Sequence, residues 1–115
     1  MSGSEALAER IAAIASDRKA TDVRVIDLRG IVSYTDFFVI CSGNTERQTK
    51  AIHDAIHEDL KAEGVLPRRV EGSREARWVL MDYSVVIVHI FDPITRDYYQ
   101  LDRLWAEAPR VLVIQ

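Results

Sequence analysis

The 115-residue sequence contains one cysteine, Cys41, only three prolines and only five glycines. A single cysteine excludes both an intrachain disulfide framework and a zinc site built from several cysteines. The longest apolar stretch, residues 85–91, is far shorter than the roughly 20 residues that a membrane-spanning helix needs. Residues 1–5 also lack the charged and apolar regions of a secretory signal. We therefore expect a cytoplasmic protein without a membrane segment.

The sequence also lacks an excess of positive charge, since 15 Lys and Arg face 18 Asp and Glu, for a net charge of -3. A protein held mainly by nucleic-acid phosphates is usually basic, because each neutralised phosphate needs a nearby cation. The balance argues against a general nucleic-acid binder but allows a protein partner within a nucleoprotein machine. With 48% hydrophobic residues, the chain can bury a core. Its length predicts a single domain, residues 1–115.

The hydrophobic periodicity predicts two long helices, residues 5–17 and 46–63. Each has a capping-box pair at its start: Ser2 with Glu5, and Thr45 with Gln48. Gly64 provides a stop for the second helix.

Alternating or continuous apolar runs predict strands at residues 23–28, 37–41, 67–70, 77–83 and 85–91, the last two forming a hairpin. Residues 100–106 could form one or two helical turns, and 111–114 are a final apolar run. This order indicates an α/β fold: a mixed sheet of about five strands with the two long helices mainly on one face.

The two helices are too few to cover both faces of such a sheet. A helix covers a strip about 10 Å wide, whereas neighbouring strands lie about 4.8 Å apart. The predicted strands 37–41 and 85–91 are nevertheless apolar on both faces. Either the C-terminal segment 101–114 covers the second face, or a partner protein or second copy of the chain does.

Two patterns resemble metal or thiol chemistry but favour simpler interpretations. His53 and His57 have the spacing of two zinc ligands on one helix face, yet the position of the general-base glutamate holds Asp54, and no third ligand is evident. We expect both histidines at the solvated border of the helix. Cys41 follows four apolar residues and has no neighbouring base, so a buried, inert thiol is expected.

The turn 42–45 joins a strand to a helix N-terminus, where free N–H groups can hold a phosphate. Nucleotidyltransferases use such a turn together with paired carboxylates on the next strand, which bind Mg²⁺. The next predicted strand, with the residue that directly follows it, offers only Glu71, and Asp22 and Asp27 lie too far apart to act as a pair. A capped turn is therefore favoured, with a nucleotide-binding protein as the alternative.

Aromatic residues concentrate in the second half of the chain, where they suit either a core or a binding surface. They are Trp78, Tyr83, Tyr98, Tyr99 and Trp105. His89 interrupts an aliphatic strand, as a hydrogen-bonded core histidine or as a polar point on an interface. The arginines between residues 68 and 77 form a weak basic edge that is suited at most to a minor RNA contact. Binding is thus the leading class of function.

Five segments occur in a specific order: Asp36–Gly43 (DFFVICSG), Thr45–Gln48 (TERQ), Trp78–Tyr83 (WVLMDY), Val88–Phe91 (VHIF) and Tyr99–Trp105 (YQLxxLW). Together they resemble the ribosomal silencing factor family, also called Iojap-like, over residues 21–105. The resemblance implies a fold related to nucleotidyltransferases but without their catalytic carboxylates, and hence no enzymatic activity and no cofactor.

The resemblance also implies a function, that of a translational repressor. Members of this family bind the large ribosomal subunit through its fourteenth protein, on the face where the small subunit docks. They block subunit joining sterically. A minor contact with ribosomal RNA is compatible with this position, and free members can be homodimers. The alternative is a degenerate, nucleotidyltransferase-like nucleotide-binding protein.

Carried over position by position, the motifs suggest nine residues that face a partner or support its binding. They are Trp78, Leu80, Asp82, Tyr83, His89, Tyr99, Leu101, Leu104 and Trp105. Some of them must belong to the core, and the sequence does not sort them. One departure concerns Ser84 and Val85, which stand where relatives often have Gly-Asp, so any contact made by that acidic residue is in doubt.

Overall fold

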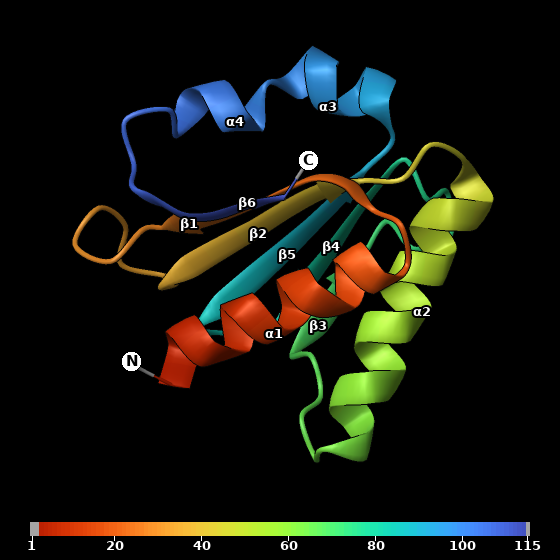
Figure 1. Cartoon of the computed structure of the whole chain (residues 1–115), viewed down its shortest axis with the longest axis horizontal. Coiled ribbons are helices and arrows are strands. Elements are labelled where there is room, and N and C mark those ends of the chain that lie inside the picture. Colours follow the sequence, from red (N-terminus) through yellow and green to blue (C-terminus); the bar gives the residue numbers. More distant parts are fainter. Residues whose placement is uncertain (1–2, 115) are drawn as a thin grey trace.

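In the computed structural model, which describes residues 3–114, one sheet separates two layers of helices (Figure 1). The elements are α1 (Gly3–Asp17), β1 (Thr21–Asp27), β2 (Phe37–Ser42), α2 (Glu46–Ala62), β3 (Arg69–Glu71), β4 (Trp78–Asp82), β5 (Val86–Phe91), α3 (Pro93–Tyr99), α4 (Leu101–Leu104) and β6 (Arg110–Ile114). Within residues 3–114, no helix is both long and apolar enough to span a membrane.

The sheet has six strands in the order β3-β4-β5-β2-β1-β6. Strands β2 and β5 are parallel, and all other neighbours are antiparallel. The mixed α/β sheet is therefore confirmed. The sixth strand comes from the C-terminal apolar run, which pairs with β1 and was not counted among the expected five.

The predicted caps of α2 are present. Thr45 Oγ1 accepts a hydrogen bond from the backbone N–H of Gln48 at 3.1 Å, and Gln48 Oε1 accepts one from the N–H of Asn44 at 2.7 Å. The reciprocal bond thus reaches one residue beyond the usual capping box. Gly64, with φ +81°, follows the helix as expected. The corresponding pair at α1 includes Ser2, which lies outside the described residues.

Helix α3 is an element that the sequence analysis missed. Asp92 caps it by accepting a hydrogen bond from the N–H of Thr95 at 2.7 Å, and Pro93 occupies the first turn. Gln100 ends it in a left-handed conformation, with φ 49°. An aspartate followed by proline is a helix-start signal. Proline also ends strands, and the prediction from the sequence has only the end of the strand 85–91 at this point.

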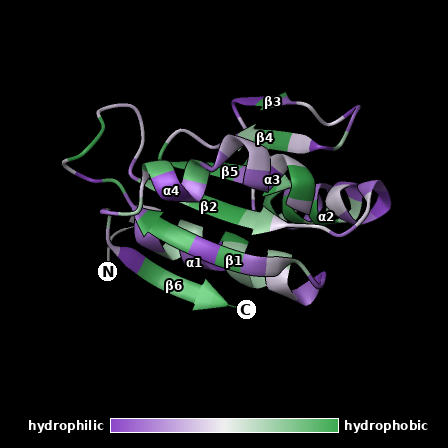
Figure 2. Ribbon diagram, turned by 90° about the horizontal axis from the view of Figure 1, so that it is seen from above, coloured by the Kyte–Doolittle hydropathy of each residue, from purple (hydrophilic) through white to green (hydrophobic). Residues whose placement is uncertain are grey.

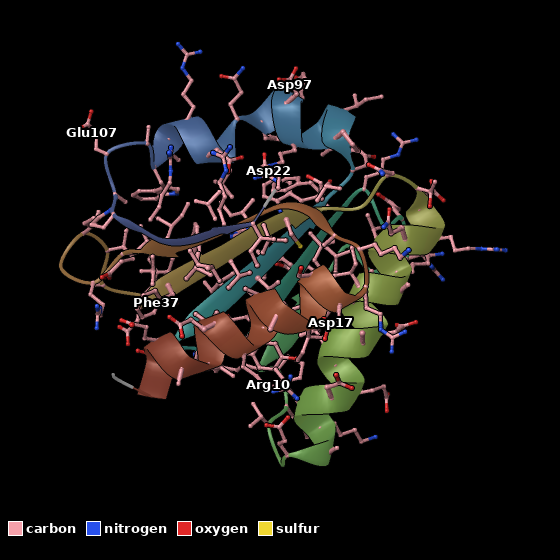
Figure 3. The ribbon with its side chains drawn as sticks, in the orientation of Figure 1. Arg10, Asp17, Asp22, Phe37, Asp97 and Glu107 are labelled. Carbon is pink, nitrogen blue, oxygen red and sulfur yellow. The ribbon has the colours of Figure 1, made fainter. Side chains whose placement is uncertain are left out.

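The sheet is buried on both faces. Helices α1 and α2 cover one face, over the alternate side chains of β2 and β5 that include Phe37, Val39 and Val88. The other face carries Phe38, Ile40 and their neighbours, packed against residues of α4 and the following loop. Figures 1 and 3 show the C-terminal segment running along this second face. Of the two alternatives for the second face, the structure supports coverage by the C-terminal segment.

The turn between β4 and β5 contains a strained residue, Ser84, whose φ of 74° lies in the left-handed region. Glycine adopts this region without the Cβ clash that costs other residues about 1 kcal/mol. Ser84→Gly should therefore raise the free energy of unfolding by about 0.5–1 kcal/mol in urea denaturation. Ser73, an exposed turn residue outside the positive-φ set, is the matched control, and Ser73→Gly should give no gain. Equal effects of the two substitutions would contradict the prediction.

Candidate functional site

Aromatic rings form a continuous row beneath and beside α3 and α4. Phe38 on β2 contacts Trp105 and His89, with ring centroids 6.0 Å and 4.6 Å away. Trp78 on β4 continues the row, since its ring lies 6.0 Å from that of His89 and 4.7 Å from that of Tyr99 on α3. The strands hold this row from below, because each contributing strand residue points to the same face of the sheet. The row therefore provides a rigid support for whatever lies at its exposed end.

The exposed end of the row is a groove of about 400 Å³ between α3 and the β3–β4 connection. We call it the aromatic groove, and its lining residues are Gly72, Glu75, Arg77, Trp78, Ile94, Thr95, Tyr98 and Tyr99. Ile94 and Tyr98 lie on the outer side of α3, 83% and 78% exposed. Exposed aromatic and aliphatic side chains held on a rigid base are typical of protein-binding surfaces.

The nine predicted partner-binding residues fall into three classes of exposure. Asp82, Tyr83 and His89 are buried; Trp78, Leu80, Leu101 and Trp105 are half-buried; Tyr99 and Leu104 are exposed. The structure brings seven of them to the α3–α4 side of the sheet, and Asp82 and Tyr83 have other surroundings. Of the nine, Trp78 and Tyr99 line the aromatic groove.

Asp82 and Tyr83 occupy interior positions at the β4–β5 turn. The Asp82 carboxylate accepts hydrogen bonds from the backbone N–H of Ser84 at 2.8 Å and from Arg68 Nη2 at 3.1 Å. Tyr83 packs in the core beneath α1 and α2, and burial raises the pKa of its hydroxyl to about 12. These contacts hold the turn together, so in this conformation both side chains support the site from within.

His89 is buried in the middle of the aromatic row. Its Nδ1 accepts a hydrogen bond from Trp78 Nε1–H at 3.1 Å, so a neutral imidazole carries its proton on Nε2. Nε2 itself has no hydrogen-bond partner among the described residues. Burial lowers the pKa of His89 to about 4, against a smaller opposing effect of Asp102. Of the two interpretations offered by the sequence, the hydrogen-bonded core histidine is confirmed, and its bond fixes the orientation of Trp78.

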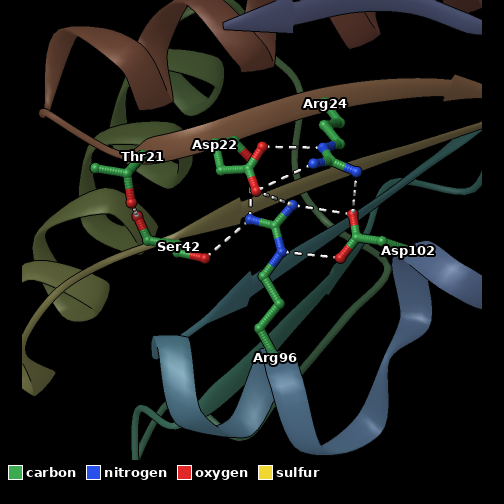
Figure 4. A network of polar contacts seen from close by, with 6 residues as sticks. All are labelled: Thr21, Asp22, Arg24, Ser42, Arg96 and Asp102. Atoms are coloured by element: carbon green, nitrogen blue, oxygen red, sulfur yellow. Dashed lines mark hydrogen bonds and ion pairs between the residues drawn. The ribbon is translucent and has the colours of Figure 1, made fainter. Parts of the chain in front are cut away.

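An ion-pair network centred on the buried Arg96 fastens the C-terminal segment to the sheet (Figure 4). Arg96 on α3 donates two hydrogen bonds to the carboxylate of Asp102, both at 2.9 Å. It also bonds the backbone oxygen of Asp22 and Oγ of Ser42, both at 2.8 Å. Arg24 adds an ion pair to Asp102 at 3.6 Å. The network thus joins α3 and α4 to β1 and β2.

This network lines a second hollow, of about 520 Å³, whose charges cancel. Three arginines and three aspartates border it, together with Thr21, Ser42, Pro93 and Gln100. Burial alone would raise the pKa of Asp102, but the hydrogen bonds and charge of Arg96 outweigh it and lower that pKa. Arg96 already donates its hydrogen bonds to protein oxygens. The residues around the hollow therefore stabilise the fold, and the hollow is poorly suited to binding an anion.

In the turn before α2, considered as a phosphate site, three backbone N–H groups already donate to protein oxygens. Gly43 N–H donates to Phe91 O at 2.9 Å, and Asn44 N–H and Gln48 N–H serve the cap. A Cβ on Gly43 would lie 2.9 Å from the backbone nitrogen of Thr49, so the turn is packed directly against the helix. This geometry favours a capped turn over the nucleotide-binding alternative.

Cys41, His53 and His57 have the surroundings that the sequence predicted. Cys41 is fully buried, and burial raises the pKa of its thiol to about 12, which makes it a poor nucleophile. The rings of His53 and His57 stack with centroids 6.0 Å apart on the outer border of α2. Within residues 3–114, no group of three or more histidine, cysteine or acidic side chains is placed to hold a metal ion.

The sequence analysis did not identify several residues of the site. Ile94 of the aromatic groove was not considered, and Tyr98 was noted only as one of several aromatic residues. Arg96 and Asp102 were also missed. The helix-start signal of Asp92 followed by proline would have placed Ile94, Arg96 and Tyr98 on one short helix, whereas Asp102 lies beyond its end, on α4.

Comparisons with known proteins agree with the resemblance of the ordered motifs. A family model described as "Ribosomal silencing factor during starvation" matches residues 2–115. Ribosomal silencing factor RsfS of Bacillus subtilis is 41% identical over 85% of this chain and 83% of its own length. The mouse protein named "Mitochondrial assembly of ribosomal large subunit protein 1" is 29% identical over 84% of this chain and 44% of its own length. A crystal structure of a protein from Chromobacterium violaceum superposes with a TM-score of 0.85 at 29% identity, over 89% of this chain and 85% of that one. The chain therefore belongs to the ribosomal silencing factor family.

Proposed function

We propose that this protein is a translational repressor that binds the large ribosomal subunit and sterically blocks joining of the small subunit. The observation that carries the proposal is the aromatic groove, an exposed apolar surface on a rigid base in a chain of this family. The name of the mouse relative includes the ribosomal large subunit. Blocking by occlusion needs only affinity and bulk, so the proposed function requires no enzymatic activity and no cofactor.

The proposed binding partner on the ribosome is a protein, the fourteenth of the large subunit. The net charge of -3 is unfavourable for gripping RNA, whereas a protein–protein patch of about 800 Å² per partner is sufficient. Any RNA contact is minor and lies at the arginine-bearing edge. There, Arg74 and Arg77 share a hollow with Glu46 and Glu75, which balance their charge. We place the protein in the cytoplasm and propose that it forms homodimers when free.

The proposal is tested by mixing the purified protein with isolated large subunits. The protein should co-sediment with large subunits through a sucrose cushion, and light scattering should show slower association with small subunits. Protein that neither co-sediments nor slows association would refute the proposal.

Two substitutions locate the binding surface. Tyr99→Ala and Leu104→Ala remove exposed side chains from α3 and α4, and each should weaken large-subunit binding by about 2 kcal/mol, or roughly 30-fold, if they are hot spots. Because both side chains are exposed, unfolding temperatures should change little. Leu66→Ala is the matched control for Leu104→Ala, since Leu66 is 61% and Leu104 69% exposed. Large-subunit binding that is equally weakened by Leu66→Ala, or unchanged in all three variants, would exclude the exposed side of α3 and α4 as the binding surface.

Tyr83 provides the contrast with the exposed positions. Its side chain lies in the core beneath α1 and α2, and removing a buried aromatic ring costs about 3–5 kcal/mol. Tyr83→Ala should therefore lower the midpoint of urea unfolding, and any loss of ribosome binding should follow the loss of folded protein. Normal stability combined with weak binding would instead assign Tyr83 to the partner surface.

A further inference from the structure

The aromatic row has a second exposed end, in the loop that joins β1 to β2. The ring centroid of Tyr34, in this loop, lies 6.4 Å from that of Phe38, and Phe38 in turn contacts Trp105. Tyr34 is 57% exposed and its neighbour Ile31 is 50% exposed. Figures 1 and 2 both show this loop projecting beyond the end of the sheet. We call the side chains of Ile31 and Tyr34 the loop patch, which lies at the end of the row opposite to the aromatic groove.

Backbone hydrogen bonds hold the loop patch in place. Ile31 N–H donates to Leu28 O at 3.0 Å, and Leu28 N–H donates to Asp36 O at 2.8 Å across the base of the loop. Val32, next to Ile31, is half-buried and packs against the apolar cluster on the α4 side of the sheet. Side chains carried by a segment that is already ordered lose less conformational freedom on binding, which favours affinity. The loop is therefore built to present two apolar side chains to a partner.

The chemistry of the loop patch suits a protein partner rather than RNA. Residues 30–35 carry no charge, in a chain in which 29% of the residues are charged. The preceding cation, Arg29, already pairs with Asp27 at 2.8 Å and with Glu5 at 3.5 Å. RNA phosphates need cations close to them, whereas exposed aromatic and aliphatic side chains fill pockets on proteins. The loop patch thus fits an apolar recess on a protein surface.

The proposed interface with the large subunit needs more surface than the aromatic groove provides. A standard protein–protein interface has about 20–30 residues on each side, whereas eight residues line the groove. Leu104, exposed on α4, directly precedes Trp105, which contacts Phe38 and so connects the α4 surface to the loop patch. We infer that the loop patch belongs to the same interface, and that Ile31 and Tyr34 insert into the large-subunit protein bound by α3 and α4.

This inference rests on the proposed function, and binding of variants to isolated large subunits tests it. Tyr34→Ala and Ile31→Ala should each weaken binding roughly tenfold, because each removes an apolar contact with the partner. Tyr34→Phe retains the ring and should bind like wild type. Leu66→Ala is the matched control for Ile31→Ala, since Leu66 is an aliphatic residue of equal size, 61% exposed between α2 and β3.

Three results of these titrations would overturn the inference. The first is wild-type affinity in both Tyr34→Ala and Ile31→Ala. The second is an equal loss in Leu66→Ala, and the third is a loss in Tyr34→Phe as large as that in Tyr34→Ala. Circular dichroism checks that each variant is folded, and both loop side chains are exposed, so unfolding temperatures should stay close to that of wild type.

Photo-crosslinking identifies the molecule that the loop contacts, without relying on a weakened variant. Tyr34→p-benzoylphenylalanine and Leu104→p-benzoylphenylalanine should each give a ribonuclease-resistant adduct with the same ribosomal protein when irradiated on large subunits, and Leu66→p-benzoylphenylalanine should give none. An adduct of position 34 with RNA, with a different protein, or with nothing while position 104 reacts, would overturn the inference alone. Wild-type protein that does not bind large subunits would refute the proposed function itself, so the two failures are distinguishable.

Discussion

Replacing Arg96 by methionine should lower the free energy of unfolding by about 3–5 kcal/mol, the range for removing one partner of a buried ion pair. Arg96 is 8% exposed and lies between α3 and the sheet. Methionine fills much of the same space but donates no hydrogen bond. The carboxylate of Asp102 and the backbone oxygen of Asp22 would then remain near the interior without their charged donor. Urea denaturation at neutral pH measures the loss.

The loss of Arg96 should destabilise α3 and α4 before it affects the rest of the fold. Arg96 joins α3 to β1 and β2, and without it the C-terminal segment keeps its apolar contacts, the longer ion pair between Arg24 and Asp102, and the pairing of β6 with β1. Partial opening that exposes backbone N–H groups speeds hydrogen exchange. Amides of α3 and α4 should therefore exchange faster in Arg96→Met under native conditions, while those of α1 and α2 should retain their protection.

Two further variants control this experiment. Arg103 is exposed, and among residues 3–114 its side chain bonds only that of Gln100, at 3.2 Å, so Arg103→Met should change stability by less than about 0.5 kcal/mol. Asp102→Leu removes the other partner, and Arg96→Met combined with Asp102→Leu should cost less than the sum of the two single changes. A loss below about 1 kcal/mol in Arg96→Met, or strictly additive effects, would show that the network contributes little to folding.

The elements that could be predicted from the sequence are those whose pattern is local. The period of α1 and α2, the Thr45–Gln48 cap and the doubly apolar β2 and β5 can each be recognised within a single stretch of chain. The helical position of α3 was also encoded locally, by Asp92 and Pro93, but Pro93 serves equally well as the end of a strand. Whether Pro93 ends a strand or begins a helix depends on the path of the chain after it.

The parts of the site that could not be predicted depend on contacts between distant segments. Arg96 meets Asp22, which lies 74 positions earlier in the chain, and no spacing rule connects such residues. The exposure of the motif residues also depends on contacts between distant segments. Tyr99 and Tyr83 are both tyrosines in recognisable motifs, yet one is on the surface and the other is in the core. Tyr83 is buried because α1 and α2 cover its face of the sheet, whereas Tyr99 is carried by α3 on the opposite side of the sheet.

His89 should make the fold sensitive to mild acid. Burial lowers its pKa from 6.5 to about 4, so the folded protein holds the imidazole neutral at a pH where the unfolded chain binds a proton. The unfolded state therefore gains protons as the pH falls below about 6.5, and stability falls with it. Since each pKa unit corresponds to about 1.4 kcal/mol, the loss should be about 2 kcal/mol at pH 5 and about 3 kcal/mol near pH 4.

The two carboxylates whose pKa values are shifted should not change the stability between pH 7 and pH 5. The pKa values of Asp27 and Asp102 are lowered in the fold, so their contributions are lost only as the pH falls below their ordinary value of 3.8. Between pH 7 and pH 5, the decline should therefore come mainly from His89. Urea denaturation at intervals across this range gives the slope directly.

His89→Gln isolates the contribution of this imidazole, because glutamine retains a hydrogen-bond acceptor for Trp78 but does not titrate. We expect the variant to be less stable than wild type at pH 7 but to lose almost nothing between pH 7 and pH 5. His53→Gln is the matched control: its imidazole lies on the outer border of α2, so the wild-type slope should persist. A wild-type slope in His89→Gln would assign the acid sensitivity to other groups. A flattened slope would show that the stability of the fold at mildly acidic pH depends on keeping the buried His89 neutral.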